Sequence, residues 1–228
     1  MRFPGFEVPD KKMAFLLVFS LVSLAAGRLN FSPLLGTENA SFTFFQFLAP
    51  IGGGIIGPFY GAAAALLAQA LNFIAFGGGT DLFSLLRFLP AVFAAWYFGS
   101  RSGNALIVPA ACMALFWLHP VGAQAPLYAL YWLIPIAAKL FSGNLFARSL
   151  GATFTAHAVG SVAFIYAIDS APALWTALIP VVAFERLLFA SGIAVSYVAA
   201  NALLEALSAR VDLSFLNLEK RRAPLKAE

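Results

Sequence analysis

Charged residues are almost absent from the long middle part of this chain. Of the 14 basic and 10 acidic residues, five lie within residues 1–12 and nine within 205–228, which leaves ten for the 192 residues between them. A charge at the centre of a bilayer is costly, so segments that span membranes carry few. The chain is 61% hydrophobic and 11% charged, against roughly 45–50% and 25% in soluble domains. We therefore predict an integral membrane protein, which excludes a soluble enzyme and a nucleic-acid binder.

Eight apolar segments fill this middle part, separated by Gly, Pro, Asn and charged residues. They are 13–27, 44–56, 59–76, 82–98, 104–118, 124–141, 145–168 and 172–208. A spanning helix needs about 20 residues, so we predict an all-α helical bundle of six to eight transmembrane helices, with residues 13–208 as a single domain. Residues 44–56 are short enough to be re-entrant. Residues 172–208 are long enough to tilt, bend near Pro180 or leave the membrane.

Basic residues predict the orientation of these helices, because Lys and Arg are enriched in cytoplasmic loops. With eight spans and residues 1–12 in the cytoplasm, eleven basic residues fall inside and Arg28 alone falls outside. Residues 209–228 then form a basic cytoplasmic tail, and 29–43 form an external loop. We expect a multi-pass protein of the cell membrane, with both termini cytoplasmic and lipid as its surroundings.

Segment 145–168 combines a packing ridge with a polar stripe. Small residues spaced by four let another helix approach closely, and a polar row runs beside them. The ridge is Ala152, Ala156 and Gly160, the row is Ser149, Thr153, His157 and Ser161, and a further small pair is Gly61 and Ala65. The hydroxyl groups favour interhelical hydrogen bonds over a functional role, whereas His157 fits both readings equally.

Glu185 and Arg186 lie well inside the last apolar segment. Neighbouring positions on a helix point about 100° apart, so we expect the two side chains to pair with other partners. His157 and Arg87 are candidates for Glu185. A buried structural ion pair and a solute-binding role are both open interpretations, since an unpaired charge facing lipid costs at least about 3 kcal/mol.

A second polar group is defined by its predicted depth rather than by its spacing. Amides, one cation and aromatic residues fall in the outer half of their segments, and together they suit an outward-facing pocket for a small polar organic molecule. These residues are Gln46, Gln69, Asn72, Asp81, Arg87 and Tyr128. We take four residues of this group, together with two polar residues from the interiors of the last two segments, as the predicted solute-binding set. The set is Gln46, Gln69, Asn72, Arg87, His157 and Glu185.

Motifs of enzymes and metal sites are absent from the sequence. Two histidines and one cysteine, Cys112, provide neither a His-Glu-x-x-His pair nor a cysteine-rich metal site. The run Gly77–Gly79 lacks the Lys-Ser/Thr of a phosphate-binding loop. We therefore predict no catalytic residues, no metal and no cofactor.

Two motifs resemble a family of membrane transporters. The sequence Gly57-Pro58-Phe59-Tyr60-Gly61, between a short Gly-containing apolar segment and a small-residue one, resembles the second and third helices of substrate-binding S components of energy-coupling factor transporters. The stretch His157-Ala158-Val159-Gly160 resembles a motif in a late helix of several such proteins. The resemblance implies a bundle that captures a vitamin-like solute and docks on a transmembrane coupling subunit with two ATPases.

Two other functions remain open from the residues alone. One is a stand-alone secondary transporter in which Glu185 and His157 relay protons. The other is a membrane enzyme or an accessory subunit of a larger complex.

Overall fold

The computed structural model describes residues 8–33 and 41–219 of the chain. Helices dominate this part, with one small two-stranded sheet. The elements are α1 (Val8–Ala26), β1 (Asn30–Pro33), β2 (Ser41–Thr43), α2 (Phe45–Ile56), α3 (Pro58–Phe76), α4 (Leu82–Leu86), α5 (Leu89–Gly99), η1 (Gly103–Leu106), α6 (Ile107–Leu118), α7 (Pro120–Gln124), α8 (Pro126–Ala129), η2 (Leu130–Trp132), α9 (Leu133–Lys139), α10 (Leu145–Ala167) and α11 (Pro172–Ser208).

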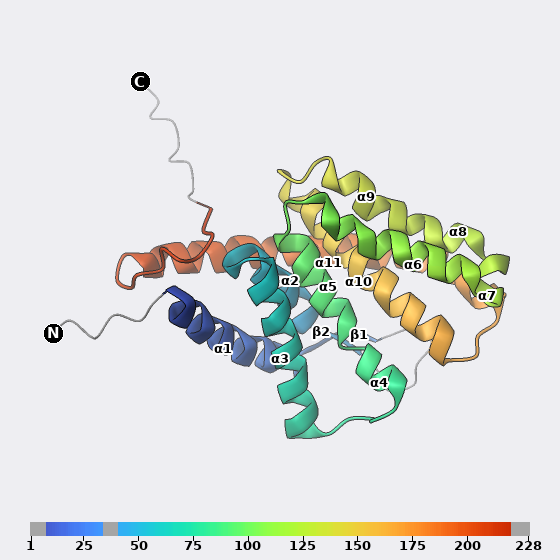
Figure 1. The fold of residues 1–228 in the computed structure, drawn as a ribbon, viewed down its shortest axis with the longest axis horizontal. Helices are drawn as coiled ribbons and strands as arrows, with labels where there is room; N and C mark the ends of the chain where they lie inside the picture. The colour runs from blue at the N-terminus through green and yellow to red at the C-terminus, as the bar shows by residue number, and fades with distance from the viewer. Residues whose placement is uncertain (1–7, 34–40, 220–228) are drawn as a thin grey trace.

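The prediction of an all-α fold is confirmed, whereas the predicted number of six to eight spans is not. Within the described residues, four helical stretches are long and apolar enough to cross a membrane: α3, α4 with α5, α10 and α11. Helix α2 and the η1–α6 stretch are apolar but shorter. The predicted segment 124–141 forms a helix broken into α8, η2 and α9, which lie end to end in Figure 1. Pro126 is the first residue of α8, and Pro135 lies in the first turn of α9. Proline lacks the N–H that continues a helix, so both residues favour breaks in this segment.

Helices α2, α3 and α5 meet backbone to backbone at three glycines. A Cβ atom added to Gly53 would lie 1.8 Å from the carbonyl oxygen of Ala95. A Cβ on Gly61 would lie 2.2 Å from Gly53 N, and a Cβ on Gly99 would lie 2.2 Å from Gly53 O. Such contacts leave no room for any side chain, so glycine is required here for close approach of the helices. We call Gly53, Gly61 and Gly99 the glycine junction.

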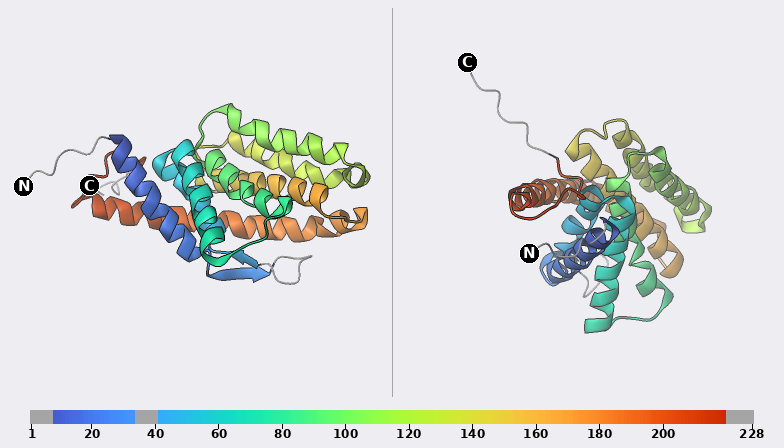
Figure 2. Two further views of the ribbon diagram at one scale, coloured as in Figure 1. Left: turned by 60° about the horizontal axis from the view of Figure 1, so that its bottom comes forward. Right: turned by 60° about the vertical axis from the view of Figure 1, so that its left-hand side comes forward.

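Helix α11 runs along the length of the molecule in the left view of Figure 2. Its 37 residues correspond to about 56 Å of helix, more than the roughly 30 Å of a bilayer core. It packs along α2 and α10, and Pro180 lies inside it without ending it. The excess length supports the prediction that this helix tilts or leaves the membrane.

Two connecting regions differ from the sequence-based expectation. Strands β1 and β2 pair antiparallel within the predicted loop 29–43, so the fold includes a β-hairpin that the hydropathy pattern did not indicate. Residues 34–40 of that loop lie outside the described residues. The predicted tail also folds back: Asn217 N donates to Ile55 O at 2.7 Å, and Glu219 N donates to Asn201 Oδ1 at 2.9 Å. The rest of that tail, 220–228, and residues 1–7 of the N-terminal segment also lie outside the described part.

The predicted small-residue contacts lie at helix interfaces with one exception. Gly61, Ala65 and Ala152 are buried against neighbouring helices, and Gly160 faces Pro90 of α5, whose Cγ would lie 3.7 Å from an added Cβ. Ala156 lines a cavity instead.

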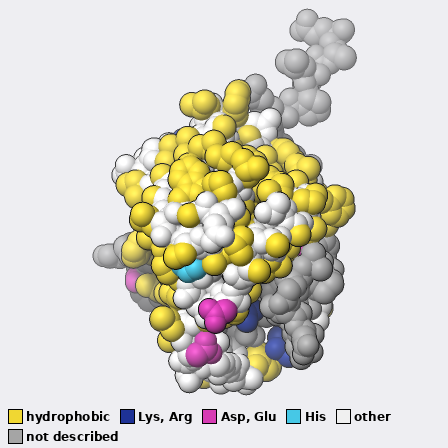
Figure 3. All heavy atoms as spheres, turned by 90° about the vertical axis from the view of Figure 1, so that its right-hand side faces the viewer, with side chains coloured by type: hydrophobic (Ala, Val, Ile, Leu, Met, Phe, Trp, Pro, Cys, Tyr) yellow, Lys and Arg dark blue, Asp and Glu magenta, His cyan; other side chains and the backbone are white. Residues whose placement is uncertain are grey.

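Many large apolar side chains are exposed on the surface. Figure 3 shows a face that is largely hydrophobic, with a few acidic and basic side chains grouped towards one edge. Large apolar side chains such as Ile74, Phe184 and Val195 are about 70% exposed or more. Exposure of this extent suits contact with lipid rather than with water.

Candidate functional site

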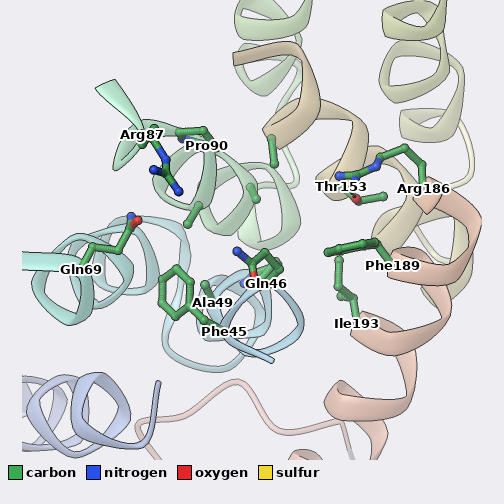
Figure 4. A pocket seen from close by; sticks show the side chains of 14 residues that line it. Phe45, Gln46, Ala49, Gln69, Arg87, Pro90, Thr153, Arg186, Phe189 and Ile193 are labelled. Atoms are coloured by element: carbon green, nitrogen blue, oxygen red, sulfur yellow. Dashed lines mark hydrogen bonds between the residues drawn. The ribbon is translucent and has the colours of Figure 1, made fainter. Parts of the chain in front are cut away.

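A cavity of about 80 Å³ lies among α2, α3, α5, α10 and α11. Figure 4 shows Arg87 and Gln69 on one side of it, Thr153 and Arg186 on the opposite side, and Gln46 between them. The other walls are apolar and include Phe45, Ala49, Pro90, Phe189 and Ile193. Convergent polar groups in an otherwise apolar hollow are a feature of small-molecule sites, and this hollow is smaller than the roughly 300–1,000 Å³ of most such sites.

Arg87 reaches the cavity because the helix around it is broken. Pro90 cannot donate to the carbonyl of Leu86, so α4 ends there and residues 87–88 form a turn before α5 begins. The side chain of Gln69 supports this turn, since its Nε2 donates to Phe88 O at 2.7 Å. Arg87 itself is exposed, and within the described residues its guanidinium has no hydrogen-bond or ion-pair partner. It lies at the mouth of the cavity.

Asp81, which lies near Arg87 in the sequence, caps the start of α4. As the N-cap of α4 it accepts from Ser84 N at 3.0 Å and from Ser84 Oγ at 2.7 Å. These hydrogen bonds hold the pKa of the Asp81 carboxyl below its ordinary value, and the bond from the Ser84 side chain has the largest effect. Both carboxylate oxygens are thus used by the cap, and Asp81 does not line the cavity.

Gln46 presents donors rather than an acceptor to the cavity. Its Oε1 accepts from the backbone N of Thr43 at 2.7 Å and from Thr43 Oγ1 at 3.0 Å. This arrangement ties the first turn of α2 to strand β2 and fixes the orientation of the amide. The Nε2 group is therefore the free end of the side chain, and it carries two N–H donors.

Arg186 is buried at the inner wall, with 5% of its surface exposed. Its Nη2 lies 3.3 Å from Oε2 of Glu185 and its Nη1 donates to Thr153 Oγ1 at 3.3 Å. The guanidinium also lies over the ring of Phe189, 4.3 Å from its centroid. Its Nε has no hydrogen-bond partner in the part of the chain that the structure describes.

The pairing of Glu185 with Arg186 corrects the sequence-based argument. Two adjacent helix positions do point about 100° apart, but both side chains are long enough for Arg186 Nη2 to come within 3.3 Å of Glu185 Oε2. Glu185 therefore pairs with neither His157 nor Arg87 in this structure.

Half of the predicted solute-binding set meets at the cavity. Gln46, Gln69 and Arg87 line it, whereas Asn72, His157 and Glu185 do not. Sequence reasoning missed the aromatic walls Phe45 and Phe189, which have no polar signal.

His157 lies in a separate aromatic cluster on another side of α10. Trp132 Nε1 donates to its Nδ1 at 3.2 Å, so the ring proton of a neutral imidazole lies on Nε2. Nε2 is 2.8 Å from Tyr128 Oη, which it reaches as the donor. Both ring nitrogens are thus satisfied within the bundle, and this favours the structural reading of His157.

Replacing His157 with leucine is expected to lower the free energy of unfolding by about 2 kcal/mol, since Trp132 N–H loses its acceptor in a buried place. The matched control is Asn72→Leu, also a polar side chain on an apolar helix, without a hydrogen-bond partner among the described residues. Thermal melting in detergent compares the two. Equal melting temperatures for His157→Leu and the wild type would refute the structural role.

The residues that the structure describes hold no group of three or more His, Cys, Asp or Glu side chains arranged to bind a metal ion. Comparisons with protein-family models, curated proteins and solved structures found no match for this chain. The cavity is the feature of the described residues that best suits a functional site.

Proposed function

We propose that this protein is a membrane subunit that binds a small polar solute and helps to transport it, in the manner of the S components that its sequence resembles. The observation that supports this most is the cavity between Arg87 and Arg186, where several polar side chains converge inside an apolar helical bundle. Ordinary helix packing would fill such a space with apolar side chains. Polar groups that point into it suit a ligand instead.

In this proposal all eight apolar segments lie in the membrane, and α1, α2, α6 and α8–α9 join the four longer helical stretches. The N-terminus and the C-terminal tail lie in the cytoplasm, as the basic residues predict. The turn at Arg87 then faces the outside, and solute enters from there. Energy for transport comes from partner subunits, a transmembrane coupling subunit with ATPases.

The proposed orientation is tested by single cysteines in a variant in which Cys112 is replaced by alanine. Thr80→Cys, in the α3–α4 loop, is expected to react with an impermeant thiol reagent in intact cells. Gly143→Cys, in the α9–α10 loop, is expected to react only after the cells are opened. Both positions are exposed. Labelling of Gly143→Cys alone in intact cells would reverse the orientation.

The secondary-transporter hypothesis has less support from the site. Its relay needs His157 and Glu185 to exchange protons. His157 is instead hydrogen-bonded to Trp132 and Tyr128, and Glu185 forms an ion pair with Arg186.

Two experiments on the intact chain separate the proposed function from its alternative. Affinity purification from native membranes in mild detergent is expected to bring down a membrane subunit and ATPases in fixed stoichiometry. Reconstituted alone in liposomes, the chain is expected to show no proton-coupled flux. A chain that purifies without partners and drives flux in response to a pH gradient would establish the secondary transporter instead.

A further inference from the structure

The charge of the cavity is unbalanced. Two guanidinium groups, of Arg87 and Arg186, line it, and no Asp or Glu does. Glu185 compensates Arg186 from beside the cavity at 3.3 Å. Arg87 has no such counter-ion within the described residues, and the nearby Asp81 is held by Ser84. One positive charge therefore remains uncompensated at a site whose other walls are largely apolar.

The hydrogen-bonding groups around the cavity are mostly donors. The Nε2 of Gln46 is its free end because Oε1 is taken by Thr43. The Nε of Arg186 is a buried donor without a partner in the described part of the chain, and a buried donor left unpaired is costly. Thr153 Oγ1 already accepts from Arg186. Gln69 Nε2 donates to Phe88 O, so its Oε1 is the group that can accept a hydrogen bond from a solute.

We propose that the solute is a small organic acid with one net negative charge, and that its carboxylate is bound in this cavity. This inference rests on the proposed function and names the chemical class of its substrate. Carboxylate oxygens accept from guanidinium and amide donors together, and Arg binds them in a two-pronged geometry. A monoanion neutralises the site, whereas a cation would meet Arg87 without compensation.

The size of the cavity limits which part of the acid it holds. A volume of about 80 Å³ accommodates a carboxylate and a few further atoms. The few atoms next to the carboxylate lie between Phe45 and Phe189, and the rest of the molecule extends past Arg87 towards the mouth. Both rings are buried, and aromatic faces favour a flat or aliphatic body over a strongly hydrated one.

The experiment identifies the compound that the whole protein carries. The wild type and four variants are purified from native membranes in mild detergent, then denatured, and the released small molecules are measured by mass spectrometry in both ion modes. The variants are Arg87→Gln, Arg87→Lys, Gln46→Glu and the control Arg28→Gln. Arg28 is also an exposed basic residue, and its guanidinium lies over the ring of Phe76, outside the cavity.

We expect wild type and Arg28→Gln to release the same organic acid in equal amounts. Arg87→Gln is expected to retain at least about tenfold less, because a charged hydrogen bond is lost. Arg87→Lys keeps the charge and is expected to retain an intermediate amount. Gln46→Glu places a second negative charge beside the carboxylate and is expected to retain none. Size-exclusion profiles verify that each variant is folded, and Gln46→Glu decides the question if Arg87→Gln aggregates.

The outcomes separate the inference from the proposed function. Release of a neutral or cationic compound, or of an acid that Gln46→Glu and Arg87→Gln retain as well as the wild type does, overturns the inference and leaves solute binding intact. Release of no compound from folded wild-type protein counts against the proposed function itself.

Discussion

Gly53→Ala is expected to prevent stable folding of the bundle. The added methyl group would lie 1.8 Å from the carbonyl oxygen of Ala95 and 3.0 Å from the backbone N of Gly99. Both atoms belong to the backbone of α5, so the clash cannot be relieved by a change of rotamer. Overpacking usually costs about 1–3 kcal/mol and occasionally more. Here two helices must separate, and we expect a cost at or above the upper end of that range.

The matched control for this change is Gly143→Ala. An added Cβ at Gly143 has no atom within 4 Å, and the residue lies in an exposed turn. Thermal melting and size-exclusion chromatography in detergent should show a wild-type-like control, while Gly53→Ala is aggregated or melts far lower. A melting temperature for Gly53→Ala within a degree of the control would mean that α2 and α5 are further apart than described.

Glu185→Leu is expected to be the second most damaging change. It leaves the guanidinium of Arg186, 5% exposed, without its carboxylate partner. Removing one member of a buried pair costs about 3–5 kcal/mol, because the other charge stays buried and uncompensated. Arg186→Met should be destabilising for the same reason, although Glu185 is somewhat more accessible, with 19% of its side chain exposed.

The double variant Glu185→Leu with Arg186→Met tests the origin of this effect. Both charges are then absent, and replacement of a buried pair by apolar residues is often nearly neutral. The double variant should therefore melt higher than either single variant. If the two losses simply add, the residues do not form the pair described, and each is stabilised by something else.

Hydrophobic patterning predicted the helices well because a bilayer imposes simple rules on sequence. The expected segments 145–168 and 172–208 match α10 (Leu145–Ala167) and α11 (Pro172–Ser208) within one residue. Asn144 and Pro172 mark the starts of these helices as a cap and a first-turn proline. The hairpin of β1 and β2 had no such signal, since its strands have only three or four residues.

Tertiary contacts were harder to anticipate than helices. Gly52-Gly53-Gly54 lies within the expected segment 44–56, which Gly57-Pro58 ends, but nothing in the sequence indicates what the triplet contacts. In the structure the triplet lies inside α2, and its middle residue forms part of the glycine junction. The burial of Arg186 over Phe189 likewise depends on how α11 lies against its neighbours.

Three residues of the candidate site share a polar side chain and a similar predicted depth in the membrane. Gln46, Gln69 and Arg87 were selected on that basis, and they line the cavity. Asn72 met the same criterion but is not among the lining residues. The angular position of a side chain around its helix depends on packing, which a single sequence does not specify.

Native mass spectrometry of the wild type in mild detergent tests solute binding most directly, with Ala156→Leu as the comparison. Ala156 lines the cavity, and a leucine there would fill much of its 80 Å³. We predict that each wild-type chain carries one small molecule, and that Ala156→Leu is folded and monodisperse but carries none. Wild-type chains with no bound molecule, or an equal amount of it on Ala156→Leu, would contradict a solute site in this cavity.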